Sequence, residues 1–330
     1  MKKNNLCLVI PFVGNYENIQ NLLYEITKMS VYPKEIVIVN SSLIDLNLQE
    51  SINNQLKTKD IEIKILNKPN LFPGAARNIG ILNTDCELIA FLDTLTIPSK
   101  DWLKNGLNLL EKDKNIQIVF GTTFYLALNK KEKIIRASTF GEKKHITLPG
   151  TILKKEILLK CGMFLENVRA GEDADWILRT KLNQIESQIN LNNLEYKGLL
   201  GLEYISVIKK WYRNYSNSSN LPYMNSHLRY YYVGLILIII LVSYNWNSVV
   251  AQWKIDSNVY IPHITKISIS FIIATYIVIR GIILPIKKNV NKFYLFPLNF
   301  LKISILSGFI DLSKIFAFFK KIKIKNKKQS

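Results

Sequence analysis

The chain has 330 residues, enough for one large domain with an appendage or for two ordinary domains. Its content of 48% hydrophobic and 21% charged residues excludes a disordered or collagen-like chain. The net charge of +19 is uneven, because residues 287–330 hold 11 basic residues and one acidic residue beside long apolar runs. A nucleic-acid-binding domain would spread such charge over its folded surface, so the pattern favours an anionic membrane as partner and argues against nucleic acid.

The first 120 residues alternate short apolar runs with amphipathic stretches. Continuous apolar runs at 6–10 and 36–39 predict parallel strands covered on both faces. Between them, apolar residues at helical spacing predict a connecting helix over 15–29. This order predicts the α/β class, with a mostly parallel sheet, helices on both faces and ligands at the carboxyl ends of the strands. Further strands are expected at 61–65, 88–92 and 116–120, and further helices at 74–83 and 101–111.

Residues 121–200 follow no regular period. A polar, basic stretch at 129–144 precedes an expected turn at 147–150, and an acidic cluster precedes an expected helix over 175–189. The three cysteines lie far apart and form no CxxC pair. We therefore expect buried, reduced thiols in a cytosolic domain and neither a zinc site nor a disulfide framework.

The composition changes to that of a membrane protein after residue 215. Two apolar runs, at about 228–246 and 264–286, each reach the roughly 20 residues that a membrane helix needs. The loop between them is almost uncharged, whereas basic residues gather after the second run. The positive-inside rule therefore predicts a multi-pass protein of the bacterial inner membrane, with the N-terminal domain and the basic tail in the cytoplasm.

A third apolar run, at about 293–319, carries Lys302, Asp311 and Lys314. Charges at such depth are expensive inside a bilayer, so the run predicts an interfacial helix, with a third span as the alternative. The expected organisation is a catalytic domain over 1–215 and a membrane domain over 216–330, which ends in the basic tail 320–330.

Several motifs follow one another at the expected strand ends. In order they are the opening at 9–11 (VIP), the run at 35–42 (EIVIVNSS), the stretch at 73–80 (PGAARNIG), the strand end at 89–93 (IAFLD) and the acidic motif at 169–173 (RAGED). Together they resemble a membrane-anchored bacterial family 2 glycosyltransferase of the GT-A fold. The resemblance covers about residues 5–215.

The resemblance implies an inverting transfer from a nucleotide sugar. Asp93, at the fourth strand end, is expected to hold Mg²⁺ or Mn²⁺ against the diphosphate of the donor. Asp173 is expected to act as general base on the acceptor hydroxyl, with its neighbour Glu172 as the fallback. Donor contacts are expected from Pro11, Asn40, Arg77, Asp93 and Arg213.

The sequence departs from the family pattern at two positions. Leu95 stands where the family has the second carboxylate of an Asp-x-Asp motif, so either Asp93 holds the ion with phosphate and water, or basic groups replace the ion. Asn40 stands where an Asp commonly meets the base of the nucleotide, which leaves the base undefined.

Simpler structural explanations exist for the same residues. Asp93 is suited to capping the turn that follows it, and Glu172 with Asp173 suits the N-terminus of a helix. Arg77 is suited equally to facing an anion and to pairing with a surface carboxylate. Arg213 ends a basic-aromatic stretch that fits either the donor site or an aromatic belt at the membrane surface.

The expected function is transfer of a sugar to a hydroxyl acceptor, with a lipid-linked acceptor favoured because the anchor holds the site near the bilayer. A lipid-linked acceptor would place the enzyme in the assembly of a cell-surface polysaccharide or glycolipid. The alternative is a catalytically inactive, membrane-anchored scaffold that binds nucleotide sugars. Retention of Arg77, Asp93, Glu172 and Asp173 favours the enzyme.

Overall fold

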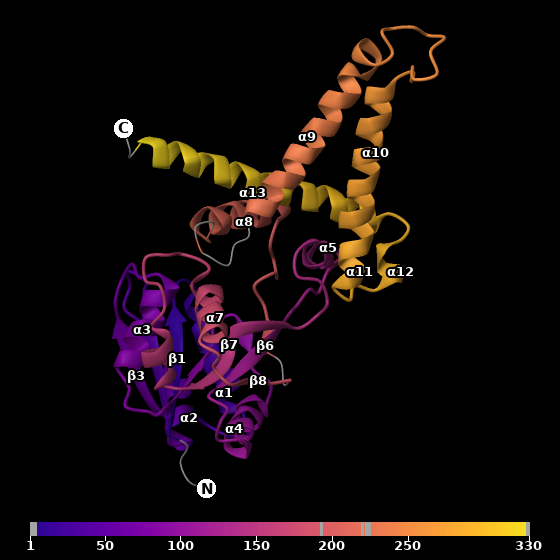
Figure 1. Cartoon of the computed structure of the whole chain (residues 1–330). Coiled ribbons are helices and arrows are strands. Elements are labelled where there is room, and N and C mark those ends of the chain that lie inside the picture. Colours follow the sequence, from indigo (N-terminus) through magenta and orange to yellow (C-terminus); the bar gives the residue numbers. More distant parts are fainter. Residues whose placement is uncertain (1–4, 192–193, 219–220, 222–225, 328–330) are drawn as a thin grey trace.

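The structure is a computed structural model that describes residues 5–191, 194–218, 221 and 226–327. An α/β body contains the N-terminal half of the chain, and two long helices project from it as a hairpin (Figure 1). A last helix crosses the base of that hairpin (Figure 1).

The body is built on one sheet of nine strands. The strands are β1 (Leu6–Phe12), β2 (Glu35–Asn40), β3 (Glu62–Asn67), β4 (Leu88–Phe91), β5 (Thr96–Ile97), β6 (Ile118–Tyr125), β7 (His145–Lys154), β8 (Ser187–Ile189) and β9 (Leu194–Tyr196). Their order is β3-β2-β1-β4-β7-β6-β9-β5, with β8 paired to β6. The half that contains β1 to β4 is parallel, and β7 introduces the antiparallel pairings with β4 and β6.

Helices cover both faces of the sheet, as expected for this class. Successive residues of β1 alternate between two cores, because side chains of a strand point to opposite faces: Leu8 enters the core under α1 and α4, and Val9 enters the core under α3 and α7. The three cysteines are buried free thiols, as expected. The helices of the body are α1 (Tyr16–Thr27), α2 (Glu50–Thr58), α3 (Pro73–Leu82), α4 (Trp102–Lys112), α5 (Lys130–Ser138), α6 (Ile157–Cys161) and α7 (Glu172–Leu182).

Two expectations for the middle of the chain are wrong, and a stretch without a predicted element contains a helix. The helix expected over 175–189 is α7, which ends at Leu182, and 187–189 form strand β8 beside β6. The turn expected at 147–150 lies within β7, where Gly150 adopts a positive φ of 85° that bends the strand without ending it. The polar stretch 129–144 contains α5, whose N-terminus is closed by a capping box between Asn129 and Glu132.

The C-terminal third is helical. It comprises α8 (Tyr204–Ser218), α9 (Ser226–Val249), α10 (Ile264–Val278), the π-helix η1 (Ile279–Ile283), α11 (Leu284–Lys287), α12 (Lys292–Leu295) and α13 (Asn299–Lys327). Among the described residues, one helix is long and apolar enough to cross a membrane, the continuous segment Ile264–Lys287 with a mean hydropathy of 2.2. A shorter apolar helix covers Val233–Val249. The expected two-span topology and the domain boundary at 215 stay predictions.

A third hydrophobic core joins α13 to the α/β body. Ile303, Leu306 and Ile310 of α13 are buried against Ile135 of α5 and Val207 of α8. The expected interfacial helix at 293–319 is therefore two helices, α12 and α13, and the second packs on the α/β body along one face. Of the expected basic tail, 328–330 lie outside the described residues.

Candidate active site

A cavity of about 460 Å³ opens at the carboxyl ends of the parallel strands. This is the position expected for the ligand of an open α/β sheet. The cavity is lined by residues from the ends of β1, β2 and β4, from the first turns of α3 and α7, and from β9 and α8. We call its buried part, with Arg77 and Glu172, the floor, and its exposed part, with Arg169 and Arg213, the rim. Its polar and aromatic lining includes Ser41, Arg77, Asp93, Arg169, Glu172, Asp173, Tyr196 and Arg213, together with Pro11.

Arg77 links two carboxylates at the floor of this cavity. Its Nη1 donates to Oε1 of Glu172 at 2.8 Å, and its Nη2 donates to Oδ1 of Asp93 at 3.0 Å. The side chains of Arg77 and Glu172 are buried, whereas that of Asp93 is 33% exposed. Arg77 thus pairs with two carboxylates of the cavity and not with a carboxylate elsewhere on the surface.

The charges of this cluster are strongly coupled. Burial alone would lower the pKa of Arg77, but the carboxylates of Asp93, Glu172 and Asp173 raise it, so the guanidinium remains charged. Burial raises the pKa of Glu172, and Arg77 opposes that rise. Three carboxylates around one arginine leave the floor of the cavity with an excess of negative charge.

Helix α3 positions Arg77 through the residues around it. Gly80 lies so close to β1 that a Cβ there would be 2.5 Å from Cγ1 of Val9, and a Cβ at Gly74 would be 2.1 Å from the carbonyl oxygen of Leu165. Asn78 donates to the carbonyl oxygen of Phe164 at 2.9 Å and accepts from its N–H at 3.0 Å. The motif at 73–80 therefore packs α3 against the sheet and against the segment that leads to α7.

Asp173 lies in the first turn of α7, at the edge of the cavity. Gly171 precedes this turn with a positive φ of 95°, and Oδ1 of Asp173 accepts from the N–H of Ala174 at 2.8 Å. The carboxylate thus sits at the positive end of the helix dipole, as the structural explanation of this motif expects. That position is compatible with a role as general base, because the side chain also lines the cavity.

The carboxylate of Asp93 points to Arg77, and the turn after it is closed by the backbone. The carbonyl oxygen of Asp93 accepts from the N–H of Thr96 at 3.0 Å, so the side chain is not the group that caps this turn. Within the described part of the chain, no three acidic, histidine or cysteine side chains gather into a metal site. A divalent ion at Asp93 would therefore need ligands from phosphates and water, as Mg²⁺ commonly does.

Asn40 is fully buried and does not line the cavity. Its amide donates to the carbonyl oxygen of Ile44 at 2.8 Å and to Oδ1 of Asn67 at 2.9 Å, and its Oδ1 accepts from the N–H of Ser42. These bonds shape the loop after β2. Its expected contact with the donor stays a prediction, and the residue of this strand end that lines the cavity is Ser41.

Two arginines stand at the rim of the cavity. Arg213, which the sequence indicated, comes from α8, and Arg169 comes from the loop before α7. No ion pair joins either of them to a carboxylate among the residues that the structure describes. Burial and the neighbouring Arg169 lower the pKa of Arg213, so the two cations are close enough to repel each other. A pair of uncompensated arginines is suited to phosphate.

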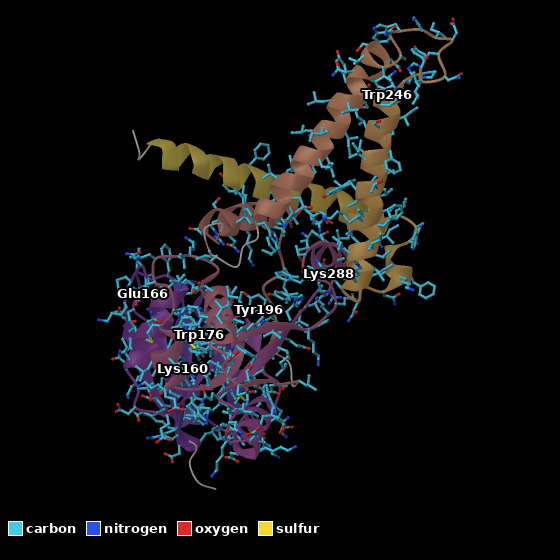
Figure 2. The ribbon with its side chains drawn as sticks, in the orientation of Figure 1. Lys160, Glu166, Trp176, Tyr196, Trp246 and Lys288 are labelled. Carbon is cyan, nitrogen blue, oxygen red and sulfur yellow. The ribbon has the colours of Figure 1, made fainter. Side chains whose placement is uncertain are left out.

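Sequence reasoning gave Arg169 and Tyr196 no role. Arg169 belongs to the acidic motif, two residues before Gly171, and this position in the sequence could have indicated a role in the site. Tyr196 lies on the short strand β9 and lines the same cavity as Asp93; it is labelled in Figure 2. Burial raises the pKa of its hydroxyl, and the charge of Asp93 adds to this rise. No periodicity marks a three-residue strand, so nothing in the sequence identifies Tyr196.

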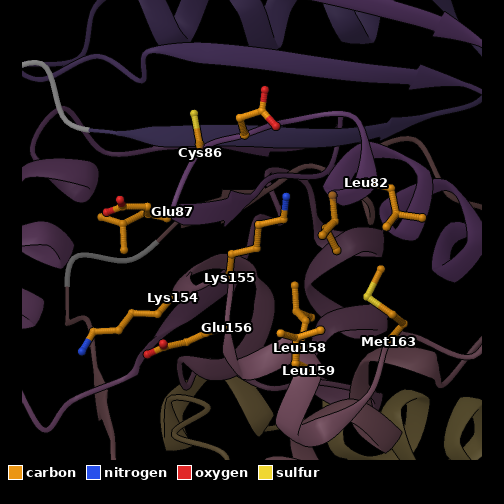
Figure 3. Close-up of a pocket in the computed structure, with 12 residues that line it drawn as sticks. Leu82, Cys86, Glu87, Lys154, Lys155, Glu156, Leu158, Leu159 and Met163 are labelled. Atoms are coloured by element: carbon orange, nitrogen blue, oxygen red, sulfur yellow. The ribbon is translucent and has the colours of Figure 1, made fainter.

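A larger cavity of about 630 Å³ lies on another part of the body, between α3, β4 and α6 (Figure 3). Leu82, Leu158 and Met163 give it apolar walls, and Lys155 crosses it to bond to the carbonyl oxygen of Thr84. It is remote from the carboxyl ends of β1 and β2. Because it lacks the arginine–carboxylate cluster, we assign the active site to the smaller cavity.

Comparisons with known proteins agree with this site. Residues 7–164 match the family model described as "Glycosyl transferase family 2". This match confirms the family resemblance read from the motifs, and it covers β1 to β7 with Arg77 and Asp93.

The matches with similar proteins cover only part of each relative's length. An uncharacterised glycosyltransferase of Rickettsia conorii is 33% identical over 139 residues, which are 38% of this chain and 22% of the relative. "Glycosyltransferase AglE" of Haloferax volcanii is 24% identical over 185 residues, 52% of this chain and 60% of the relative. The chain thus spans about a fifth of the Rickettsia relative and three fifths of the Haloferax one.

A solved structure shares the fold over almost the whole chain. The mannosyltransferase PcManGT from Pyrobaculum calidifontis, solved with GDP-Man and Mn²⁺, superposes with a TM-score of 0.51 at 11% identity, covering 97% of this chain and 88% of that one. At this identity the likeness concerns the fold alone. It confirms the expected GT-A-type architecture.

Proposed function

We propose that this chain, whose residues 7–164 match the model of glycosyl transferase family 2, transfers a sugar from a nucleotide-sugar donor to an acceptor hydroxyl with inversion. The observation that carries the proposal is the cluster in which Arg77 joins Asp93 and Glu172 beside Asp173, in a cavity rimmed by two arginines. The carboxylates of this cavity can accept the proton of the acceptor hydroxyl, and its two arginines can bind the departing diphosphate.

In this proposal Asp173 is the general base. Its carboxylate takes the proton of the acceptor hydroxyl while the hydroxyl oxygen bonds to the anomeric carbon of the donor. The bond between that carbon and the phosphate oxygen breaks, and the nucleoside diphosphate leaves with the bonding electrons. Glu172 is committed to Arg77 at 2.8 Å, so we assign it a positioning role and keep it as the alternative base.

The diphosphate is bound by two kinds of group. Arg169 and Arg213 face it from the rim, where charge-assisted hydrogen bonds to its oxygens offset their mutual repulsion. Asp93 would hold Mg²⁺ or Mn²⁺ together with the phosphates and water, since Arg77 bonds to only one of its two carboxylate oxygens. That ion would supply further neutralisation of the leaving group.

The acceptor in this proposal is lipid-linked, as in the assembly of a cell-surface polysaccharide or glycolipid. Support comes from the apolar segment Ile264–Lys287, whose most apolar stretch is only 6% buried within the protein. Its C-terminal end adjoins α5 of the catalytic body (Figure 1). Residues 1–215 would form a cytoplasmic transferase domain and 216–330 a membrane domain with two spans.

The test is a donor screen on the full chain in detergent, with release of nucleoside diphosphate as readout. UDP-, GDP- and dTDP-sugars would be offered with a bacterial lipid extract, in Mn²⁺, in Mg²⁺ and in EDTA. We expect one donor to be consumed only when lipid is present, with loss of release in EDTA. Full release in EDTA would overturn the metal role of Asp93, and no release from any donor would overturn the transferase.

The alternative function, an inactive nucleotide-sugar-binding scaffold, is favoured by one observation, the presence of Leu95 where the family has a second carboxylate. A scaffold would bind one of the donors without releasing its diphosphate under every metal condition. Calorimetric titration of the same donors into the same preparation separates the two functions.

A further inference from the structure

A second charged cluster lies where the membrane segment meets the catalytic body. Asp311 of α13 forms an ion pair with Arg280, whose Nε lies 2.9 Å from its Oδ2, and its Oδ1 accepts a hydrogen bond from Nζ of Lys314 at 3.0 Å. Lys288, just after α11, donates to the carbonyl oxygen of Thr139 at the end of α5. We call Arg280, Lys288, Lys314 and Asp311 the cationic junction.

The cationic junction has more positive than negative charge. Arg280 and Lys314 pair with Asp311, and Lys288 and Lys143 add two nearby cations, while Glu142 is paired with Arg136. Burial together with Arg280, Lys314 and Lys143 lowers the pKa of Lys288 to about 8, which Asp311 only partly offsets. The site would be stabilised by an added anion.

The location of the cationic junction indicates which anion would bind there. Arg280 and Lys288 flank the C-terminal end of the segment Ile264–Lys287, the end at which a spanning helix would reach the headgroup layer. Lys288 lies at the end of α11, beside α5 of the α/β body (Figure 2). Basic pockets between membrane helices on the cytoplasmic side bind phosphate headgroups of lipids.

Local geometry also sets this end of the segment apart. Arg280 lies in η1, a single π-helical turn, and such turns inside α-helices occur frequently at functional sites. Gly281 in the same turn lets the backbone of α13 approach closely, since a Cβ there would be 2.5 Å from the carbonyl oxygen of Phe300. Asp311 is 34% exposed, so the cluster is open to a ligand.

A row of aromatic side chains connects the cationic junction with the active site. Nζ of Lys314 lies 4.8 Å from the ring centre of Trp211, which lies 6.0 Å from that of Phe140. Phe140 stacks on Tyr125 at 3.6 Å, and Tyr125 lies 5.3 Å from Tyr196 in the cavity wall. The rings of Trp211 and Tyr196 are therefore at most about 15 Å apart, within reach of one extended substrate.

We propose that the cationic junction binds the phosphate group of the lipid-linked acceptor, with the acceptor reaching along the aromatic row to Asp173. This inference rests on the proposed function for its substrate. It adds a site in which Arg280 and Lys314 hold the phosphate and the lipid chain lies beside α10. The donor diphosphate is bound separately, by Arg169 and Arg213.

The test compares Arg280→Gln, Lys314→Gln and Asp311→Asn in the full chain, with Lys292→Gln as the matched control. Lys292 is an exposed cation near the same end of the segment, so it reports general attraction to anionic membrane. We expect the KM for a polyprenyl-diphosphate-linked acceptor to rise about tenfold in Arg280→Gln and in Lys314→Gln, with the donor KM unchanged. Lys292→Gln should leave both constants unchanged.

Asp311→Asn distinguishes a phosphate site from a structural ion pair. Removal of the carboxylate increases the positive charge, so the acceptor KM should fall. A rise like that in Arg280→Gln would mean that the cluster only holds α13 in place, and would overturn the proposal. An unchanged acceptor KM in all three variants would overturn it as well.

Vesicle binding separates this proposal from the transferase activity, because it requires no turnover. Phosphatidylcholine vesicles with added polyprenyl diphosphate should bind the wild-type chain about tenfold more tightly than vesicles with equal phosphatidylglycerol, and inorganic phosphate should compete weakly. Equal binding to both vesicles would make the junction a general phospholipid site and overturn the acceptor assignment. Selective binding without any sugar transfer would instead refute the proposed function.

Discussion

The chain contains two arginine–carboxylate clusters with opposite charge ratios. At the floor of the active site, Arg77 lies among Asp93, Glu172 and Asp173, so carboxylates exceed cations. At the cationic junction, Asp311 is surrounded by basic groups, so cations exceed carboxylates. The cations Arg77, Arg280 and Lys314 are largely buried, and an unbalanced charge is expensive away from water.

The ratio indicates which ligand each cluster lacks. An excess of carboxylates is relieved by a proton or a divalent cation, which suits proton abstraction and metal binding. An excess of cations is relieved by phosphate. Two ion-pair clusters of similar geometry therefore predict different ligands when one has a surplus of negative charge and the other a surplus of positive charge.

The largest effect is expected from removing the base. Asp173→Asn should lower kcat about 10²- to 10⁴-fold, because the amide cannot accept the proton of the acceptor. Donor affinity, measured by titration calorimetry, should stay within about twofold of wild type because the amide keeps the size of the side chain. Asp85→Asn, an exposed carboxylate in the other cavity, is the matched control and should retain full activity. Retained turnover in Asp173→Asn would transfer the role of base to Glu172.

The second-largest effect is expected on stability, from removing the positive charge that pairs with the carboxylates at the floor of the active site. Arg77→Met leaves Asp93 and Glu172 without their shared partner, and breaking a buried pair in this way should cost about 3–5 kcal/mol of unfolding free energy in urea. Lys104→Met, at an exposed position on α4, should cost less than about 0.5 kcal/mol.

Arg77→Met should also change the pH dependence of stability. Burial raises the pKa of Glu172 and Arg77 opposes this, so the variant should raise it further. A carboxyl whose pKa is higher in the folded state stabilises the fold at low pH and loses this contribution as the pH rises through the folded value. The deficit relative to wild type should therefore shrink from about pH 7 to about pH 5. A deficit independent of pH would show that Glu172 does not titrate in this range.

The sequence predicted the parts of this site that depend on local patterns. The strands at 6–10 and 36–39 were predictable because each is a continuous apolar run, and the helix at 74–83 because it lies between two expected strands. Asp93 and Asp173 both line the cavity, one just after a strand and the other in the first turn of a helix, and their roles there stay predictions.

The contacts between distant segments were not predictable. Arg77 and Glu172 are 95 residues apart, and spacing alone could not choose between an anion-facing and a paired arginine. Strands β8 and β9 have three residues each, too few for a period, so Tyr196 was missed. The turn expected at 147–150 was inferred from Pro149 and Gly150, but pairing with β6 keeps this segment in the sheet.

A smaller effect is expected from Asn78, which holds the segment before α7 and so helps to place the acidic cluster. Asn78→Ala leaves the carbonyl oxygen and N–H of Phe164 unsatisfied in a buried position, which should cost about 2 kcal/mol in urea unfolding. We also expect a lower kcat with donor KM unchanged, because α7 carries Asp173. Asn54→Ala, exposed on α2, is the control. Stability lost without any change in kcat would show that the segment does not position the base.

The smallest effect is expected at the rim, where the active site itself has surplus positive charge. Arg213→Gln removes one charge-assisted bond to the diphosphate and should raise the donor KM about tenfold, while kcat changes little. Lys209→Gln, exposed on the same helix and outside the cavity, controls for the general loss of a cation. If the acceptor KM rises in place of the donor KM, Arg213 belongs to the acceptor path. The acid-rich floor and the cation-rich rim would then bind different substrates, and the donor diphosphate would depend on Arg169 and a metal ion at Asp93.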